Sequence, residues 1–243
     1  MNPANSEIPD VEPTTDRFPD DLVLIIGAGH FGKRAACILR DKSDSPILII
    51  DKEKKSLEKI ETLPTEKVVS DGVRFLAKNI DKLNPSSFII PAIPLHLAAE
   101  WLKAYLEARG WKITLNEPPE EILSHLPHVW EGIGGTLLIS YADFLCPDDC
   151  PEPLDHCPTT GETRPEPLHD LLSHLDVPKH QIYIVRSRQL APGLGGYRAE
   201  DLRDLLKKVK QKEGKWLVGT ACKCHGALTA LEAHSAKGGA HSV

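Results

Sequence analysis

The hydrophobic residues in the first half of the chain form short apolar runs separated by amphipathic segments. Residues 22–26 are continuously apolar and are followed by glycines, and a second run at 47–50 ends in Asp51. Such runs are typical of strands buried on both faces of a parallel sheet. Further strands are predicted at 67–69 and 87–90, with helices between them. This alternation predicts an α/β fold with a Rossmann-like, doubly wound parallel sheet over residues 21–118.

The rhythm weakens after residue 118, and a smaller Cys-rich α/β region is predicted over residues 119–234. Its expected elements are strands at 135–141, 182–185 and 216–218 and helices at 168–175, 199–212 and about 227–233. Residues 146–167 are rich in Pro, Cys, Asp and Glu, which excludes a regular helix or central strand. So long an irregular segment is expected to be disordered or organised around another group.

Both ends of the chain lack the hydrophobic periodicity of folded elements. Residues 1–20 contain four prolines among polar side chains and are predicted to be a disordered lead-in. Residues 235–243 are rich in Gly, Ser and His and are predicted to be a flexible tail.

The first predicted strand leads directly into the motif Gly27-Ala28-Gly29-His30-Phe31-Gly32. In a dinucleotide site, Gly27 permits the tight turn, Gly29 lets the backbone approach a pyrophosphate, and Gly32 lets the helix pack on the strand. The positive end of that helix attracts phosphate. His30 and Phe31 lie in the same loop and are further candidates for contact with the cofactor.

Asp51 stands at the tip of the second predicted strand, 19 residues beyond Gly32. An acid at this position accepts hydrogen bonds from both ribose hydroxyls and repels a 2'-phosphate, which favours NAD(H) over NADP(H). Lys52 is also a candidate for the cofactor site, and with Lys54 it weakens that preference. The alternative interpretation is that the glycines only make a turn, and that the site is vestigial or takes another adenine nucleotide.

Three segments together resemble the TrkA-N, or RCK, family: residues 24–32, 49–52 and 68–72. These are NAD- or nucleotide-binding regulatory domains of potassium channels and transporters. The resemblance covers about residues 22–108 and not the Cys-rich half. It implies that Asp71 lies near the adenosine, that the protein forms a homodimer, and that a membrane transporter for potassium is its partner.

Five of the six cysteines fall into two tight groups, Cys-x3-Cys-x6-Cys and Cys-x-Cys-His. Gathered thiolates repel one another unless a cation neutralises them, and soft sulfur ligands select zinc or iron-sulfur clusters. Each cysteine of the first group precedes a proline, as at the final ligand of bacterial ferredoxin runs. The predicted metal ligands are Cys146, Cys150, Cys157, Cys222, Cys224 and His225. A thiol–disulfide switch and ordinary reduced cysteines remain the alternatives.

Composition narrows the classes of partner and location. The formal net charge of -6 argues against a nucleic-acid partner. No apolar run approaches the roughly 18 residues of a transmembrane helix, and the N-terminus lacks the pattern of a signal peptide. A cytoplasmic location is therefore expected, where clustered cysteines hold metal more often than they form disulfides.

These features support three hypotheses of function. The first is an NAD(H)-binding regulatory or redox-sensing protein of TrkA-N type, linked to potassium transport. The second is an NAD-dependent oxidoreductase or electron-transfer protein that uses the cysteine cluster with a redox partner protein. The third is a structural zinc-binding assembly protein. No Ser-His-Asp or paired-carboxylate arrangement is evident, so the sequence leaves enzymatic activity open.

Overall fold

The computed structural model describes residues 17–60 and 62–236 and divides into two compact units, Met1–Ile93 and Pro94–Val243. Residues 1–16 of the predicted lead-in (1–20) and residues 237–243 of the predicted tail (235–243) lie outside the described residues, whereas Ser235, where the tail was expected to begin, is the last residue of a strand. Phe18, at the end of the expected lead-in, is buried, with its ring 6.4 Å from that of Phe75. The architecture is α/β, as the sequence predicts.

Unit 1 is built on four parallel strands in the order β3-β2-β1-β4. Every residue of β1 is buried, so neighbouring elements cover both faces of this strand. The strand bounds are β1 (Val23–Ile26), β2 (Ile47–Asp51), β3 (Glu66–Val69) and β4 (Phe88–Pro91).

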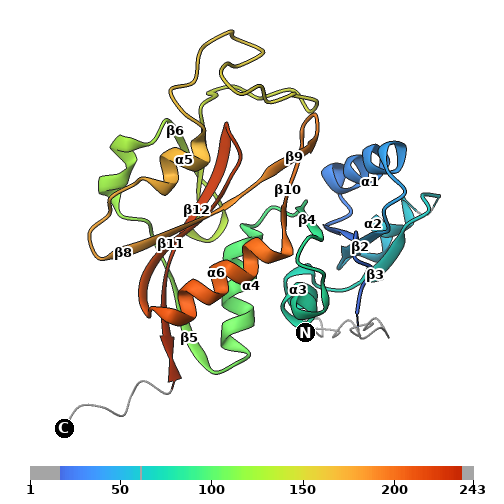
Figure 1. Ribbon diagram of the computed structural model, residues 1–243, viewed down its shortest axis with the longest axis horizontal. Coiled ribbons are helices and arrows are strands. Elements are labelled where there is room, and N and C mark those ends of the chain that lie inside the picture. Colours follow the sequence, from blue (N-terminus) through green and yellow to red (C-terminus); the bar gives the residue numbers. More distant parts are fainter. Residues whose placement is uncertain (1–16, 61, 237–243) are drawn as a thin grey trace, which may run out of the picture. The chain divides into compact units, whose positions relative to one another are not determined.

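The helices of unit 1 follow their strands closely in the chain (Figure 1). They are α1 (His30–Lys42), α2 (Lys54–Glu58) and α3 (Gly72–Asn79), with a 3-10 turn at Ile80–Lys82. Helix α1 buries mainly small residues, Gly32, Ala35 and Ala36, so its backbone can lie close to the sheet. Its last turn carries Arg40 and Lys42, whose positive charges complement the negative end of the helix.

Unit 2 is built on a second sheet with the order β6-β7-β12-β11-β8, in which β5 also pairs with β12. Strand β8 is parallel to β11, and the other pairs are antiparallel. The bounds are β5 (Trp111–Asn116), β6 (His128–Glu131), β7 (Leu137–Ser140), β8 (His180–Arg186), β11 (Gly214–Ala221) and β12 (His225–Ser235).

Helices cover both faces of this sheet (Figure 1). Helices α4 (Leu97–Glu107) and α6 (Ala199–Gln211) lie on one side. On the other, α5 (Leu168–Ser173) and the 3-10 segment Glu120–His125 bury Leu168, Leu172 and Ile122 against β11 and β12. A further 3-10 turn spans Ile133–Gly135, and β9 (Arg188–Ala191) and β10 (Leu194–Arg198) form a hairpin.

The helix expected at 227–233 is wrong, because these residues form the middle of β12. Their alanines and leucines have high helix propensity. However, β12 pairs with β11 along one edge and with β7 and β5 along the other. Each ladder satisfies backbone hydrogen-bonding groups within the sheet, and this long-range pairing overrides local propensity.

The division between the units falls after Ile93, whereas the sequence pattern placed a boundary at residue 118. The segment between these positions forms α4 and β5. Strand β5 pairs with β12 from Trp111↔Ser235 to Asn116↔Ala230, and α4 packs on β5 and β11. The alternation of strands and helices along the chain therefore continues past Ile93, although α4 and β5 pack on the second sheet.

Within residues 17–60 and 62–236, no helix is both long enough and apolar enough to cross a membrane.

Candidate functional site: a glycine loop and a thiol-lined cavity

Two glycines of the loop between β1 and α1 leave no room for a side chain. Gly27 has a φ of 106°, and a Cβ there would clash with the carbonyl group of Ala92. A Cβ on Gly32 would clash with the carbonyl group of Gly27. These two glycines therefore set the sharp turn and the close packing of α1, the roles expected from their spacing.

Gly29, the middle glycine, differs because a Cβ there would meet no atom within 4 Å. It is exposed and is the N-cap of α1, with φ −68° and ψ −161°, a conformation open to other residues. The first turn of α1 itself contains no acidic residue. The space beside Gly29 is thus accessible at the amide end of the helix.

Asp51 joins the end of β2 to this loop. Its Oδ2 accepts a 2.6 Å hydrogen bond from the amide of Ala28, and its Oδ1 accepts a 2.7 Å bond from the amide of Glu53. The carboxylate is therefore fixed beside the glycine loop while remaining partly accessible. Lys52, which follows it, is exposed.

The remaining predicted residues of unit 1 lie at helix starts. His30 and Phe31 begin α1, are exposed, and contact each other edge to face with ring centroids 5.2 Å apart. Asp71 caps α3, because its carboxylate accepts a 2.9 Å hydrogen bond from the amide of Arg74. This cap explains the carboxylate without any ligand.

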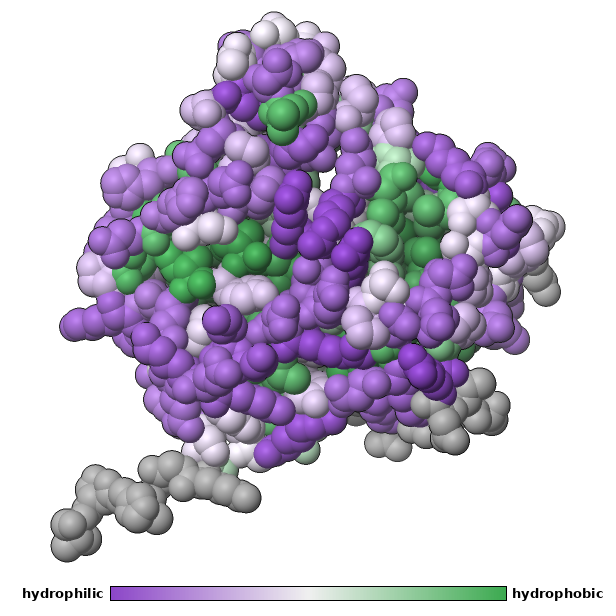
Figure 2. All heavy atoms as spheres, in the orientation of Figure 1, coloured by the Kyte–Doolittle hydropathy of each residue, from purple (hydrophilic) through white to green (hydrophobic). Residues whose placement is uncertain are grey.

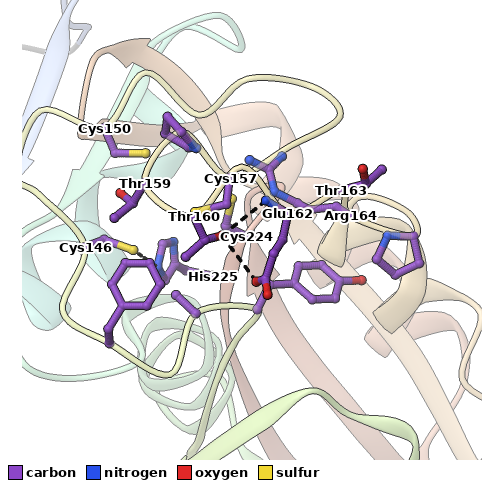
Figure 3. A pocket seen from close by; sticks show the side chains of 15 residues that line it. Cys146, Cys150, Cys157, Thr159, Thr160, Glu162, Thr163, Arg164, Cys224 and His225 are labelled. Carbon is purple, nitrogen blue, oxygen red and sulfur yellow. Dashed lines mark hydrogen bonds between the residues drawn. The ribbon is translucent and has the colours of Figure 1, made fainter.

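A cavity of about 390 Å³ in unit 2 is lined by four of the six cysteines (Figure 3). Cys146, Cys150 and Cys157 come from the irregular loop, with their sulfur atoms directed toward the same space. Cys224 comes from the turn between β11 and β12, next to His225, which begins β12. The Sγ of Cys146 lies 3.4 Å from Nε2 of His225.

The cavity thiols influence one another electrostatically. Burial raises the pKa of Cys146, and the neighbouring Cys150 and Cys157 raise it further. Burial raises the pKa of Cys224 to about 12. By contrast, a hydrogen bond from the backbone of Thr160 lowers the pKa of Cys157. Burial also lowers the pKa of His225, which favours its neutral ring.

Cys222 does not line the cavity, although the sequence grouped it with the other ligands. Burial raises the pKa of its thiol to about 12, and a nearby carboxylate, that of Glu152, raises it further. Its Sγ also accepts a 3.4 Å contact from the amide of His225. The structure thus brings five of the six predicted ligands together and leaves Cys222 outside.

The irregular loop is organised rather than disordered, and Arg164 holds much of it. The guanidinium group is buried and donates to the carbonyl oxygens of Pro153 (2.5 Å), Leu154 (3.3 Å) and His156 (2.5 Å). On the face seen in Figure 2, the projecting loop is mainly hydrophilic with a small hydrophobic patch. Sequence reasoning missed Arg164, although it is the only Lys or Arg in residues 146–167.

Glu152 ties the loop to the turn that carries Cys224. Its Oε1 accepts a 2.6 Å hydrogen bond from the amide of Lys223, and its carbonyl accepts a 2.9 Å bond from Nζ of the same lysine. Glu152 is buried and has a φ of 48°, an uncommon conformation for a residue other than glycine. The sequence gives no signal for this contact, because it joins positions 71 residues apart.

The β9–β10 hairpin clamps the other end of the loop. The carbonyl of Cys150 accepts hydrogen bonds from the amide of Gly193 (2.8 Å) and from Nε2 of Gln189 (2.9 Å). A Cβ on Gly193 would clash with the carbonyl of Asp148, and its φ is 66°.

We expect Gly193→Ala to lower the free energy of unfolding by at least about 2 kcal/mol, because it combines left-handed backbone strain with this clash. Gly161→Ala is the matched control, since Gly161 has a φ of 74° and open space around a Cβ. The control should lose only about 1 kcal/mol. Denaturant unfolding and the labelling rate of the cavity thiols measure the difference. Equal losses in the two variants would show that the clamp contributes nothing.

Among the described residues, no group of three or more His, Cys, Asp or Glu side chains is arranged to hold a metal ion as it stands.

The geometry defines an α/β protein with a glycine loop in one unit and a thiol-lined cavity in the other. A family model described as "Uncharacterized protein, C-terminal domain" matches residues 98–234, which include every predicted thiol and imidazole ligand. A curated protein of Archaeoglobus fulgidus, described as "Uncharacterized protein", is 34% identical over 222 residues, covering 86% of this chain and 98% of the relative. The chain belongs to this family.

The resemblance to TrkA-N or RCK domains is wrong, because the chain matches this other family and no TrkA-N or RCK model. The glycine spacing and the acid after the second strand are steric and hydrogen-bonding requirements of dinucleotide binding in general. Unrelated families therefore share them. The adenosine contact of Asp71 and the link to potassium transport lose their basis with this correction.

Proposed function

We propose that unit 1 is a Rossmann-type dinucleotide-binding unit that takes NAD(H), and that the protein acts as a redox-sensing or regulatory protein. The observation that carries this proposal is the hydrogen bond from Ala28 to the carboxylate of Asp51. It supports a single site in which the glycine loop and the ribose-binding acid are neighbours. The parallel order β3-β2-β1-β4 agrees with one half of a doubly wound sheet.

The contacts suit the two polar parts of a dinucleotide. The pyrophosphate would lie beside Gly29, where there is open space and no acidic residue in the first helical turn. The ribose hydroxyls would donate to Asp51. Its negative charge disfavours a 2'-phosphate, so NADP(H) should bind more weakly than NAD(H).

An NADH and NADPH titration of the Asp51→Asn variant tests this proposal. We expect the Kd for NADH to rise about 10- to 100-fold, because a charged hydrogen-bond acceptor contributes about 1.5–3 kcal/mol. Discrimination against NADPH should fall as well. Asp44→Asn removes the same charge from an exposed position of unit 1 and should bind like the parent. Unchanged NADH affinity in Asp51→Asn would refute the assigned site.

A second candidate function is an NAD-dependent oxidoreductase or electron-transfer protein. The thiol-lined cavity of unit 2 favours it, because clustered cysteines are the ligands of electron-transferring metal centres. The two candidates share the NAD(H) site and differ in whether electrons leave the bound nicotinamide. Anaerobic mixing with NADH distinguishes them, since only the second predicts oxidation of NADH coupled to reduction of a centre in the protein.

A further inference from the structure

The thiols of Cys146, Cys150, Cys157 and Cys224 are brought together by contacts that connect their backbones. Arg164 gathers the loop carbonyls, Glu152 holds the loop to the turn of Cys224, and the β9–β10 hairpin holds the carbonyl of Cys150. These contacts fix the segments that carry the thiols. The architecture therefore builds a sulfur-lined space rather than a chance cluster.

The arrangement of the thiols bears on which group four thiolates can hold. A single zinc ion binds sulfur at about 2.3 Å, so its four ligands converge around one atom. The cavity is lined by fifteen residues, four of them cysteines, and among these described residues no three Cys, His, Asp or Glu side chains converge on one point. A cluster bonds each thiolate through a different iron atom, so it requires less convergence of the thiols and less movement of the loop than a single ion.

We infer that Cys146, Cys150, Cys157 and Cys224 bind an iron-sulfur cluster of the four-iron type, and that Cys222 is not a ligand. Each ligand thiol releases its proton to solvent as its sulfur bonds to iron. The proline after each of the three loop cysteines agrees with the turn found at ferredoxin ligands. Zinc is the group that this inference excludes.

Two cavity residues complement such a cluster without being ligands. His225 lies 3.4 Å from the Sγ of Cys146 and can donate a hydrogen bond to the bound sulfur when Nε2 carries the proton. Arg164 also lines the cavity, and its guanidinium charge offsets the net negative charge of a cluster held by four thiolates. Both features favour an anionic metal–sulfur group.

The experiment uses the full chain, expressed and purified without oxygen. We expect a brown protein with broad visible absorption, about four iron and four acid-labile sulfide ions per chain, and no stoichiometric zinc. Cys157→Ser and Cys224→Ser should each lower bound iron and sulfide at least about tenfold. Cys222→Ser and Cys37→Ser, outside the cavity, should keep the iron and sulfide content of the parent.

The outcomes separate loss of the cluster from loss of the fold. The far-UV circular dichroism of each variant reports folding, and the inference requires iron loss in folded Cys157→Ser. A colourless protein containing zinc would overturn it, as would an iron content unaffected by both cavity variants. The site lies in unit 2 and does not require NAD(H) binding. Titration of NADH on the same preparations therefore distinguishes failure of this inference from failure of the proposed function.

Discussion

Gly29→Ala should abolish tight NADH binding while leaving the stability of the protein nearly unchanged. A Cβ at this position meets no atom within 4 Å, and the backbone is already in a region that alanine adopts. The free energy of unfolding should change by no more than about 1 kcal/mol, the usual cost of an alanine at an N-cap. The same Cβ stands where the pyrophosphate must approach the backbone, so the Kd should rise at least about tenfold.

Gly32→Ala is the contrasting variant, because its Cβ would collide with the carbonyl of Gly27 within the folded chain. Neither group can move without displacing α1 from the sheet. We expect a loss of about 2–4 kcal/mol despite the higher helix propensity of alanine. Urea unfolding and NADH titration of both variants make the comparison. Parent-like NADH affinity in Gly29→Ala would remove the proposed cofactor from this loop.

These glycines show why the strands and the first turn of unit 1 can be predicted from the sequence. An apolar run records burial on both faces, and two of the three motif glycines have a local role: Gly27 takes a positive φ, and Gly32 packs against the carbonyl of Gly27, five residues earlier. The expected strands at 22–26 and 47–50 therefore correspond closely to β1 and β2. Unrelated families share these steric requirements, so the glycine motif could not identify the family.

The structure of unit 2 is harder to predict from the sequence, because it depends on contacts between residues far apart in the chain. The helical composition of 227–233 gave way to strand pairing on both edges of β12. Spacing grouped Cys222 with Cys224, but a tight turn directs neighbouring side chains differently, and Cys222 meets Glu152 from a loop far away in the sequence. Composition did show that residues 146–167 are irregular. It could not show that Arg164 and Glu152 organise them.

A buried histidine gives the second large effect, a loss of stability in mild acid. His96 is buried, and its Nδ1 lies 2.8 Å from Oγ1 of Thr229, which in turn lies 2.8 Å from Oγ1 of Thr136. Its Nε2 is buried and has no hydrogen-bond partner. Burial lowers the pKa of His96 from 6.5 to about 4.

This lowered pKa makes unfolding easier as the pH falls. Between pH 6.5 and about 4 the unfolded chain binds a proton at this histidine and the folded chain does not. The stability contributed by neutral His96 is complete above pH 6.5 and is lost as the pH falls toward 4. The full loss is about 3 kcal/mol.

Urea unfolding of the parent and of His96→Asn at pH 7.5, 6 and 5 measures the effect. Asparagine can keep a hydrogen bond to Thr229 and does not titrate, so the variant should be less stable at pH 7.5 but lose less on acidification. His225 also has a lowered pKa, and it contributes equally to both proteins because only position 96 differs. His128→Asn, at an exposed position, should retain the parental pH dependence. If the free energy of unfolding of His96→Asn fell with pH as steeply as that of the parent, the acid sensitivity would belong to other groups. The two proteins differ only in whether position 96 can bind a proton on unfolding.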